Sequence, residues 1–414
     1  MLYDSVLSNA QKIRFHTPGH GELPPDLWKT DVTELPYSDN LATPTGAIKD
    51  LEKFLASAYR AEAAFLSTQG ATHNIMQAIY ATKDDGAFLV VGKAHLSVYN
   101  ALRLFGTKAY HVDEPYDYSD VPEDVKTVVL TSPDYFGKTL PLDSIGKNLR
   151  QKSLTLIVDS AHGAHFAFSS KLPVSASEYG DLVILSVHKT LPVLTGGSVL
   201  VCKEKFFDKA KYARNLLHTT SPNYIVMCSI ELAVKRFLSE GEKIYDDIYR
   251  AIDDFTKSLS APYRVVPTDD FSRLVVESPY DGAAVAEALY ERGFVCETSY
   301  ENKVVFIVTC ANFFFLPTLR RVLEELPPQR AYVERQSPFR PHPHPTELSF
   351  GAGWTLVPLE KAVGKRSFSE VGLYPPGVPL LYAGDVVTDR IVEFLKSDPE
   401  KTFGLENGRL RVIN

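Results

Sequence analysis

The chain has 414 residues, of which 44% are hydrophobic and 23% are charged, as in an ordinary globular protein. Its formal net charge of -7 gives no electrostatic reason to expect nucleic acid as a partner. No apolar run reaches the roughly 20 residues of a membrane helix, and the four cysteines show no CxxC pairing. These features exclude disordered, fibrous and membrane-spanning classes and favour a cytoplasmic protein of two or three domains.

Residues 1–45 are rich in proline and glycine and show little apolar periodicity, so we expect an N-terminal arm lying on a surface. From 46 to 255, short apolar runs alternate with helical patterns. The runs are continuously apolar, which is typical of buried parallel strands. This pattern predicts an α/β domain with a mostly parallel sheet. The predicted strands are 87–92, 127–132, 154–160, 181–186 and 198–202, and the predicted helices are 51–58, 96–104 and 225–238.

Residues 256–414 have a different pattern of apolar residues. Residues 256–330 combine short apolar runs with one helical pattern at 283–292, which predicts a small α+β domain. A proline-rich stretch at 326–345 is typical of a linker. We therefore expect a separate C-terminal lobe over 331–414, ending in a helix near 389–396.

Lys189 stands in the motif SVHK at 186–189, directly after the apolar run at 181–186. The carboxyl ends of parallel strands are where α/β sheets bind ligands. A lysine taken alone is most often a solvated loop residue. Here the turn-rich segment around Gly196 and Gly197 leads straight into another strand, so we treat Lys189 as a candidate catalytic residue.

Asp159 ends the run at 154–160 and begins the motif DSAHGAH at 159–165. A carboxylate at the end of a buried strand is unfavourable unless it has a partner, and a protonated pyridine nitrogen is one natural partner. Two alternatives remain open at this point. Asp159 would serve as a helix N-cap, or Asp159, His162 and His165 would bind a metal, although the sequence shows no further ligand cluster.

Two further features follow predicted strands. The segment STQGATHN at 67–74 leads into a helix, whose free N–H groups and dipole suit an anion. Such a segment is also a common structural cap. His95 follows the strand at 87–92, and its imidazole can stack on a flat heteroaromatic ring. For His95 alone, a plain surface or core histidine is the simpler interpretation.

Taken together, these residues form one constellation, because each follows a strand of the same predicted sheet. An anion loop, a stacking histidine, a carboxylate and a lysine are the parts of a pyridoxal 5'-phosphate (PLP) site. Their order along the chain is that of fold-type-I PLP enzymes. The sequence therefore predicts PLP as the cofactor, with Lys189 as its Schiff-base lysine and no metal.

The sequence resembles the bacterial ornithine/lysine/arginine decarboxylases of fold type I. The matching segments are FHTPGH at 15–20, DVTELP at 31–36, DNL at 39–41, PTGAIK at 44–49, GAT at 70–72, AH at 94–95, TSPDY at 131–135, DSAHGAH at 159–165, SVHKTL at 186–191, TTSPNY at 219–224 and YPPGVP at 374–379. The resemblance implies a fold-type-I PLP-dependent transferase-like α/β fold. It further implies a mostly parallel, seven-stranded-type large domain, smaller α+β C-terminal domains, and the short form without an N-terminal receiver-like domain.

The resemblance also assigns roles by position. It implies that Lys189 carries PLP, that Asp159 pairs with the pyridine nitrogen, and that His95 and Ala161 lie on the two ring faces. The catalytic residues expected are Lys189, His188, His95 and Asp159. The cofactor-binding residues expected are Gly70, Ala71, Thr72, His95, Asp159, Ala161, His162, Ser186, His188, Lys189, Thr219 and Thr220. Thr219 or Thr220 would reach the phosphate of a neighbouring subunit, so a homodimer or an assembly of dimers is expected.

The implied reaction is decarboxylation of arginine, lysine or ornithine, with arginine favoured over lysine, to an amine of polyamine biosynthesis. Asp159 keeps the pyridine nitrogen protonated, and Lys189 or His188 returns a proton to Cα. A cationic substrate side chain needs an acidic partner, and the resemblance points to Glu370. A solvated surface charge is an equally good interpretation of Glu370.

Two departures from the family pattern concern the substrate. Gly196-Gly197 stand where the family commonly has glutamine after Leu-Thr, and Gly21-Glu22 follow His20 where Lys-Gly is common. The alternative function is another fold-type-I reaction, an aminotransferase or lyase, in which Arg273 would hold the substrate carboxylate. A third hypothesis is a non-catalytic regulatory homologue, against which the retained Lys189 and Asp159 argue.

Overall fold

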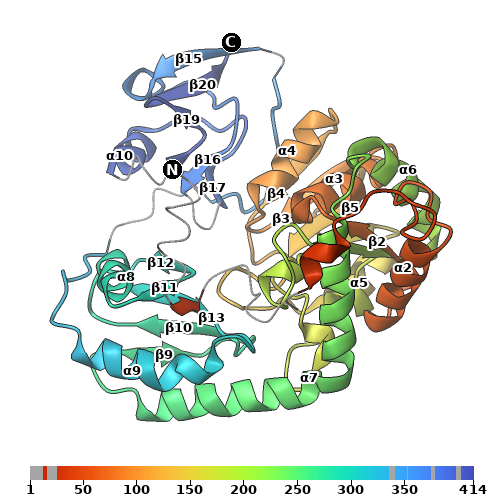
Figure 1. Ribbon diagram of the computed structural model, residues 1–414. Coiled ribbons are helices and arrows are strands. Elements are labelled where there is room, and N and C mark those ends of the chain that lie inside the picture. The colour runs from red at the N-terminus through yellow and green to blue at the C-terminus, as the bar shows by residue number, and fades with distance from the viewer. Residues whose placement is uncertain (1–12, 16–25, 335–340, 352, 374–377, 398–401) are drawn as a thin grey trace.

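The structure is a computed structural model that describes residues 13–15, 26–334, 341–351, 353–373, 378–397 and 402–414. Three parts are visible in Figure 1: a large α/β domain, a small domain beside it, and a C-terminal lobe above both. The motif segments at 16–20 and 374–377, and the Gly21-Glu22 departure, lie outside the described residues.

An eight-stranded sheet forms the centre of the large domain, in the order β14-β4-β3-β5-β6-β7-β8-β2. Strands β4, β3, β5, β6 and β7 run parallel, whereas β8 is antiparallel to both of its neighbours. The strands are β2 (Ala63–Ser67), β3 (Ala87–Val91), β4 (Ala109–Val112), β5 (Val125–Thr131), β6 (Thr155–Asp159), β7 (Leu182–Leu185), β8 (Ser198–Cys202) and β14 (Thr346–Glu347). All five predicted strands are present, while β2, β4 and β14 were not predicted.

Helices cover both faces of this sheet (Figure 1). They are α2 (Ala47–Ala58), α3 (Gly70–Thr82), α4 (Leu96–Leu104), α5 (Leu142–Gln151), α6 (Phe207–Leu217) and α7 (Tyr224–Ser258). Residues of α2, α5 and α7 pack in one apolar core, and residues of α3, α4 and α6 pack in another. Because Leu89 of β3 faces the first core and its neighbours Phe88 and Val90 face the second, the strand is apolar throughout.

Helix α7 is much longer than the sequence predicts. The expected helix at 225–238 continues to Ser258, for 35 residues in all. A polar stretch around Gly241 hides the continuation, yet Gly241 is needed there because a Cβ would lie 2.5 Å from the carbonyl oxygen of Phe168. The buried stripe then resumes with Tyr245 and Ile248. In consequence α7 runs from the large domain along the small domain (Figure 1).

The small domain contains a four-stranded antiparallel sheet in the order β12-β13-β10-β9. Its elements are β9 (Arg264–Val266), β10 (Arg273–Glu277), β12 (Thr298–Tyr300), β13 (Lys303–Ile307), α8 (Gly282–Glu291) and α9 (Leu316–Glu325). A further strand, β11 (Phe294–Cys296), pairs in parallel with β1 (Ile13–Phe15). Phe15 is fully buried between Phe294 and Phe306, so this part of the predicted arm is anchored to the small domain.

The C-terminal lobe contains two three-stranded sheets, β15-β20-β19 and β17-β16-β18. Its elements are β15 (Trp354–Pro358), β16 (Val371–Leu373), β17 (Val378–Leu381), α10 (Asp389–Ser397), β18 (Thr402–Phe403), β19 (Leu405–Glu406) and β20 (Arg409–Ile413). Strand β14 precedes the lobe and pairs with β4, so it adds an eighth strand to the seven-stranded sheet expected from the sequence.

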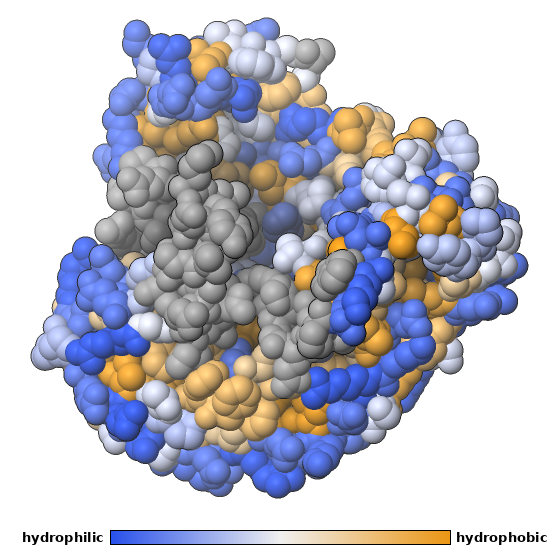
Figure 2. All heavy atoms as spheres, in the orientation of Figure 1, coloured by the Kyte–Doolittle hydropathy of each residue, from blue (hydrophilic) through white to orange (hydrophobic). Residues whose placement is uncertain are grey.

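The surface is mixed in character. Figure 2 shows hydrophilic residues over the top of the lobe and the outer edges, and hydrophobic residues gathered over the lower part, where the small domain lies. In the part of the chain that the structure describes, no helix is long and apolar enough to cross a membrane.

Candidate active site

Lys189 and Asp159 meet at the carboxyl edge of the central sheet. Asp159 is the last residue of β6, and Lys189 lies in a single 3-10 turn, Val187–Lys189, just after β7. The two strands are parallel neighbours, so their ends lie side by side. Burial and the positive charge of Arg273 lower the pKa of Lys189, while the carboxylates of Asp159 and Glu297 act in the opposite direction.

The surroundings of Asp159 fit a buried anion that faces a cation. The residue is 4% exposed, and its Oδ1 accepts a hydrogen bond of 3.1 Å from the backbone N–H of Ala161. This turn brings Ala161, which is also buried, next to the carboxylate. This contact closes a local turn and engages one carboxylate oxygen. The next helical turn, Phe166–Phe168, has His165 as its N-cap, so the helix N-cap role considered from the sequence is wrong for Asp159.

His95 completes the predicted group. It caps the N-terminus of α4, where its Nδ1 accepts the backbone N–H of Ser97 at 3.2 Å and lies 2.7 Å from Ser97 Oγ. These contacts fix the plane of an imidazole whose outer side remains open to solvent. Surrounding protein lowers the pKa of His95, an effect that Asp159 opposes and Lys189 strengthens. All three side chains thus lie within electrostatic reach of one another.

The predicted phosphate loop is open at the start of α3. Gly70 has a φ of +75°, and a Cβ built on it would meet nothing within 4 Å. The helix has no side-chain cap at Gln69, so N–H groups of its first turn are available to an anion. Ser186 precedes Lys189 by three residues and is fully buried. Its Oγ lies 3.2 Å from Nδ1 of His188. This donor set suits a phosphate group.

Gly196 and Gly197 connect the lysine motif to the phosphate loop. The carbonyl of Gly196 accepts the N–H of Gly70 at 2.8 Å, and the carbonyl of Gly197 accepts Nδ1–H of His188 at 2.9 Å. Gly196 has a φ of +95°, and a Cβ there would lie 2.8 Å from the backbone oxygen of Thr68. A glutamine, common at this position in the family pattern, does not fit this backbone. The departure is therefore a structural feature of the cofactor region.

The two histidines of DSAHGAH contact the small domain. His162 lies between Lys189 and Arg273, with Nε2 3.0 Å from Lys189 Nζ and Nδ1 2.6 Å from Arg273 Nη2. His165 Nε2 lies 3.2 Å from Asp270 Oδ2. The three residues of the metal-site alternative therefore have different partners: His162 faces Lys189 and Arg273, His165 faces Asp270, and Asp159 accepts from Ala161. Among the described residues, no group of three His, Cys, Asp or Glu side chains is suited to a metal ion.

Two residues near Lys189 were missed as site residues by the sequence analysis. The hydroxyl of Tyr135 donates to Glu297 Oε1 at 2.7 Å, and the Tyr135 ring meets the His162 ring edge-on at 5.1 Å. Glu297 comes from the small domain and acts electrostatically on Lys189. Tyr135 stood in the matched segment TSPDY and could have been named, whereas Glu297 follows an ordinary strand and carried no signal.

The two substrate candidates lie in different places. Arg273 is 1% exposed and joins the Lys189 group through His162. Glu370 is 2% exposed and forms an ion pair of 3.0 Å with Arg103. Burial raises the pKa of Glu370, and Arg103 acts against this rise. Arg103 is eight residues after His95 on α4, about 12 Å along the helix axis, so a role of Glu370 in substrate binding stays a prediction.

Thr219 and Thr220 lie beside the phosphate loop of their own chain. Both are exposed just after α6, and the N–H of Thr219 donates to Oε1 of Gln69 at 3.0 Å. The neighbouring His218 accepts the N–H of Thr68 through Nε2 at 3.2 Å. Their predicted contact with the phosphate of another subunit stays a prediction.

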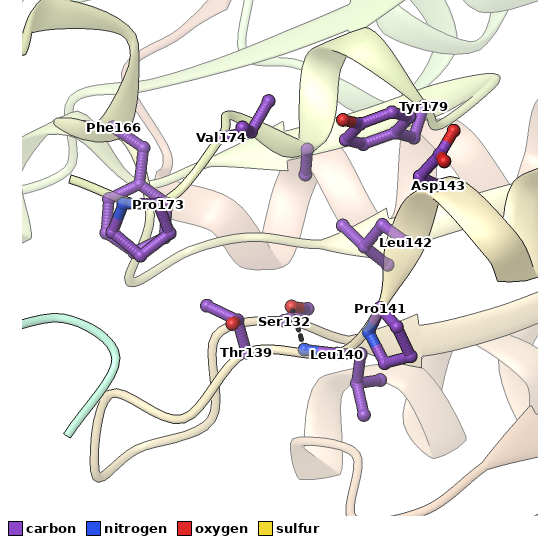
Figure 3. A pocket seen from close by; sticks show the side chains of 11 residues that line it. Ser132, Thr139, Leu140, Pro141, Leu142, Asp143, Phe166, Pro173, Val174 and Tyr179 are labelled. Carbon is purple, nitrogen blue, oxygen red and sulfur yellow. Dashed lines mark hydrogen bonds between the residues drawn. The ribbon is translucent and has the colours of Figure 1, made fainter. Parts of the chain in front are cut away.

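A small pocket of about 190 Å³ has Ser132 in its lining, and the N–H of Ser132 donates to the backbone carbonyl of Asp159 at 3.0 Å. Figure 3 shows it between the segment around Ser132 and Leu140 and the segment around Pro173 and Val174. In the view a hydrogen bond of 3.0 Å joins Leu140 N–H to Ser132 Oγ. Its lining is largely apolar and includes none of the residues predicted to hold PLP.

Comparison with protein families identifies the chain. Residues 5–278, more than half of its length, match the family described as Orn/Lys/Arg decarboxylase, major domain. The chain belongs to the Orn/Lys/Arg decarboxylase family. An uncharacterized protein of Bacillus subtilis strain 168, YaaO, is 27% identical, with 95% of this chain and 93% of YaaO covered. The arginine decarboxylase of Bacillus anthracis is 25% identical, covering 96% of this chain and 93% of the relative.

Solved structures share the fold of this family member. The Francisella novicida lysine decarboxylase LdcF aligns with a TM-score of 0.71 at 16% identity, covering 94% of this chain and 75% of LdcF. The constitutive lysine decarboxylase of E. coli gives 0.73 at 18% identity, covering 94% and 76%. Serine palmitoyltransferase from Sphingomonas wittichii gives 0.62 at 18% identity, covering 76% and 86%.

These findings confirm the predicted fold type, cofactor and class of enzyme. The protein is a PLP-dependent decarboxylase with the α/β architecture of fold-type-I enzymes. The described residues fit the cofactor independently of the family match. They provide an uncapped helix N-terminus, a buried carboxylate and a half-buried lysine at one sheet edge.

Proposed function

We propose that this enzyme decarboxylates a basic amino acid, with arginine preferred over lysine and ornithine, to an amine of polyamine biosynthesis. The observation that carries the proposal is the grouping of Lys189, Asp159 and His95 at one edge of the sheet, in a member of the Orn/Lys/Arg decarboxylase family. Four curated relatives named arginine decarboxylase support the preference for arginine. The four cysteines are scattered and show no CxxC pairing, which supports a reducing, cytoplasmic location.

The residues of the chain have distinct tasks in this reaction. When bound, PLP supplies an electron sink for the electron pair left by departing carbon dioxide. Asp159 holds a proton at the pyridine nitrogen, and His95 and Ala161 fix the plane of the ring. The start of α3, at Gly70, Ala71 and Thr72, and Ser186 hold the phosphate. Lys189 or His188 delivers a proton to Cα at the end of the reaction.

We also propose Glu297 as the partner of the cationic substrate side chain. Its half-buried carboxylate acts on Lys189 and is oriented by the hydroxyl of Tyr135. Glu370 already has Arg103 as its partner, so it is the weaker candidate in the single chain. Replacing each by glutamine separates them: Glu297→Gln should raise KM for the basic substrate more than Glu370→Gln does. The reverse order would restore Glu370.

The decisive experiment incubates the PLP-loaded protein separately with arginine, lysine and ornithine. We expect release of carbon dioxide and one matching amine, fastest with arginine, and no product with Lys189→Ala. A keto acid formed without carbon dioxide would indicate an aminotransferase and overturn the proposal. No reaction with any of the three basic amino acids would overturn it as well.

The proposed assembly is a homodimer with shared sites. Mixing inactive Lys189→Ala chains with chains that carry both Thr219→Ala and Thr220→Ala creates hybrids in which one site is wholly wild type. Activity should therefore partly return once subunits exchange. A lack of recovery despite proven exchange, or full activity of a monomer, would refute the shared site.

A further inference from the structure

His162 joins the active lysine to an arginine of the small domain. Its Nε2 lies 3.0 Å from Nζ of Lys189, and its Nδ1 lies 2.6 Å from Nη2 of Arg273. His162 is 8% exposed and Arg273 is 1% exposed, so water competes little for these contacts. The three side chains come from the loops after β6 and β7 and from the start of β10.

The donors and acceptors of these three side chains determine which ring nitrogen of His162 carries the proton. A guanidinium group has only donors, so Nδ1 of His162 must accept from Arg273 and carries no proton. A neutral imidazole then has its proton on Nε2, which faces Lys189. An ammonium group also has only donors and cannot accept this proton. The geometry is therefore satisfied when Lys189 is a neutral amine whose lone pair faces His162.

Arg273 is held firmly in place for this contact. His165 lies 3.2 Å from Asp270 Oδ2 and 3.1 Å from Ser272 Oγ, both on the turn that leads into Arg273. On the other side Gly137 packs so closely that a Cβ there would lie 2.7 Å from Cγ of Arg273. His165 thus stabilises the turn before Arg273, while His162 accepts a hydrogen bond from the guanidinium group.

We propose that Arg273 is a positioning residue that acts through His162 to hold the side chain of Lys189 as a neutral amine, ready to capture the cofactor. In the capture step, the amine would turn its lone pair from Nε2–H of His162 to the aldehyde carbon of PLP. A C=N bond would then replace the C=O bond, and the oxygen would leave as water with the two amine hydrogens. An ammonium group has no such lone pair. The inference rests on the proposed role of Lys189 as the PLP lysine.

The other charged and titratable groups around Lys189 do not reverse this arrangement. Asp159 and Glu297 favour the ammonium form, yet burial and Arg273 prevail, and the pKa of Lys189 is lowered. His95 is the further titratable neighbour, and its pKa is also lowered by burial. The pKa of His162 is lowered well below its usual value by burial and by the positive charges of Lys189 and Arg273, consistent with a neutral ring.

The test measures the protonation of Lys189 directly, in the full-length protein freed of PLP. An acylating reagent labels free amines, and mass spectrometry quantifies the Lys189 peptide across a pH series. We expect Lys189 to label with a lower pH midpoint than the lysine of an unstructured reference peptide. Arg273→Gln should raise the midpoint by about one pH unit, which slows labelling about tenfold at pH values below both midpoints. Arg273→Lys, which keeps a group that can only donate toward Nδ1 of His162, should restore most of the wild-type midpoint.

His162→Phe provides a second route, because it keeps a planar ring and removes both ring nitrogens. It should raise the midpoint as Arg273→Gln does. Because part of the Arg273 effect passes through His162, the double variant should raise the midpoint by less than the sum of the two single shifts. Arg60→Gln, which alters an exposed ion pair with Glu178, is the matched control and should leave the midpoint unchanged. Thermal unfolding checks that each variant is folded.

Two results would overturn the inference. Unchanged midpoints in folded Arg273→Gln and His162→Phe would show that neither residue affects the protonation of Lys189. Fully additive shifts in the double variant would show that Arg273 acts only directly through space and not through His162. Because the labelling uses no amino-acid substrate, failure of the relay is distinguishable from failure of the proposed decarboxylation.

Discussion

Gly196→Ala tests how the lysine motif is joined to the phosphate loop. Gly196 has a φ of +95°, a conformation that costs an L-residue about 1–2 kcal/mol. The added Cβ would also lie 2.8 Å from the backbone oxygen of Thr68, two residues before Gly70. Relieving such a contact in a packed region costs about another 1–3 kcal/mol. The combined cost is therefore about 2–5 kcal/mol.

Part of this cost should appear in cofactor binding. Moving the chain at Thr68 displaces the start of α3, which is held by the hydrogen bond from Gly70 N–H to the carbonyl of Gly196. If the substitution destabilises the PLP-bound protein by about 1.4 kcal/mol more than the PLP-free protein, the Kd for PLP rises tenfold. We expect at least this tenfold weakening, measured by titrating PLP-free protein with PLP and following the absorbance of the bound cofactor.

Gly106→Ala is the matched control. Gly106 also has a positive φ, +63°, but a Cβ there meets nothing within 4 Å, and the residue lies just after α4. It should lower the free energy of unfolding by about 1 kcal/mol and leave PLP affinity unchanged. Equal PLP affinities for Gly196→Ala and the wild type would show that Gly196 does not position the phosphate loop.

Three further predictions concern charged residues. Asp159→Asn should retain PLP but lower kcat about 10³-fold, because the ring nitrogen loses its charged partner. Near-normal steady-state turnover would show that Asp159 only stabilises the turn to Ala161. Arg103→Met removes the ion-pair partner of the buried Glu370 carboxylate and should lower the free energy of local unfolding of the C-terminal lobe by about 3 kcal/mol. Amide hydrogen exchange in β16 should therefore become faster, and unchanged exchange would contradict this prediction. Burial, opposed by Arg214, raises the pKa of Glu52 from 4.5 to about 7, so the folded state binds the extra proton between these values. The free energy of unfolding should therefore fall by about 3 kcal/mol as the pH rises from 4.5 to 7, and Glu52→Gln should lack this decline in denaturant titrations; parallel pH profiles would count against it.

Much of the site was readable from the sequence, because its parts are local to strands. Continuous apolar runs predict parallel strands, and the residue after each run lies at the same sheet edge. For this reason Lys189, Asp159 and His95 could be grouped although they are 94 residues apart at the extremes. The same reasoning failed for α7, since its polar middle section interrupts the apolar pattern and packing of Gly241 on Phe168 decides that the helix continues.

Contacts between the domains could not be predicted from the sequence. Arg273 could be named from the sequence only as a possible partner of the substrate carboxylate, and nothing in the local pattern around Glu297 points to Lys189, because both belong to a domain with its own sheet and its own register. Only the packing of the small domain against the loops after β5 and β6 brings Arg273 to His162 and Glu297 to Tyr135. Likewise, the pairing of Glu370 with Arg103 follows from the docking of the lobe on α4. Strand periodicity acts within a few residues and fixes the catalytic edge, whereas long-range packing decides which charges face it.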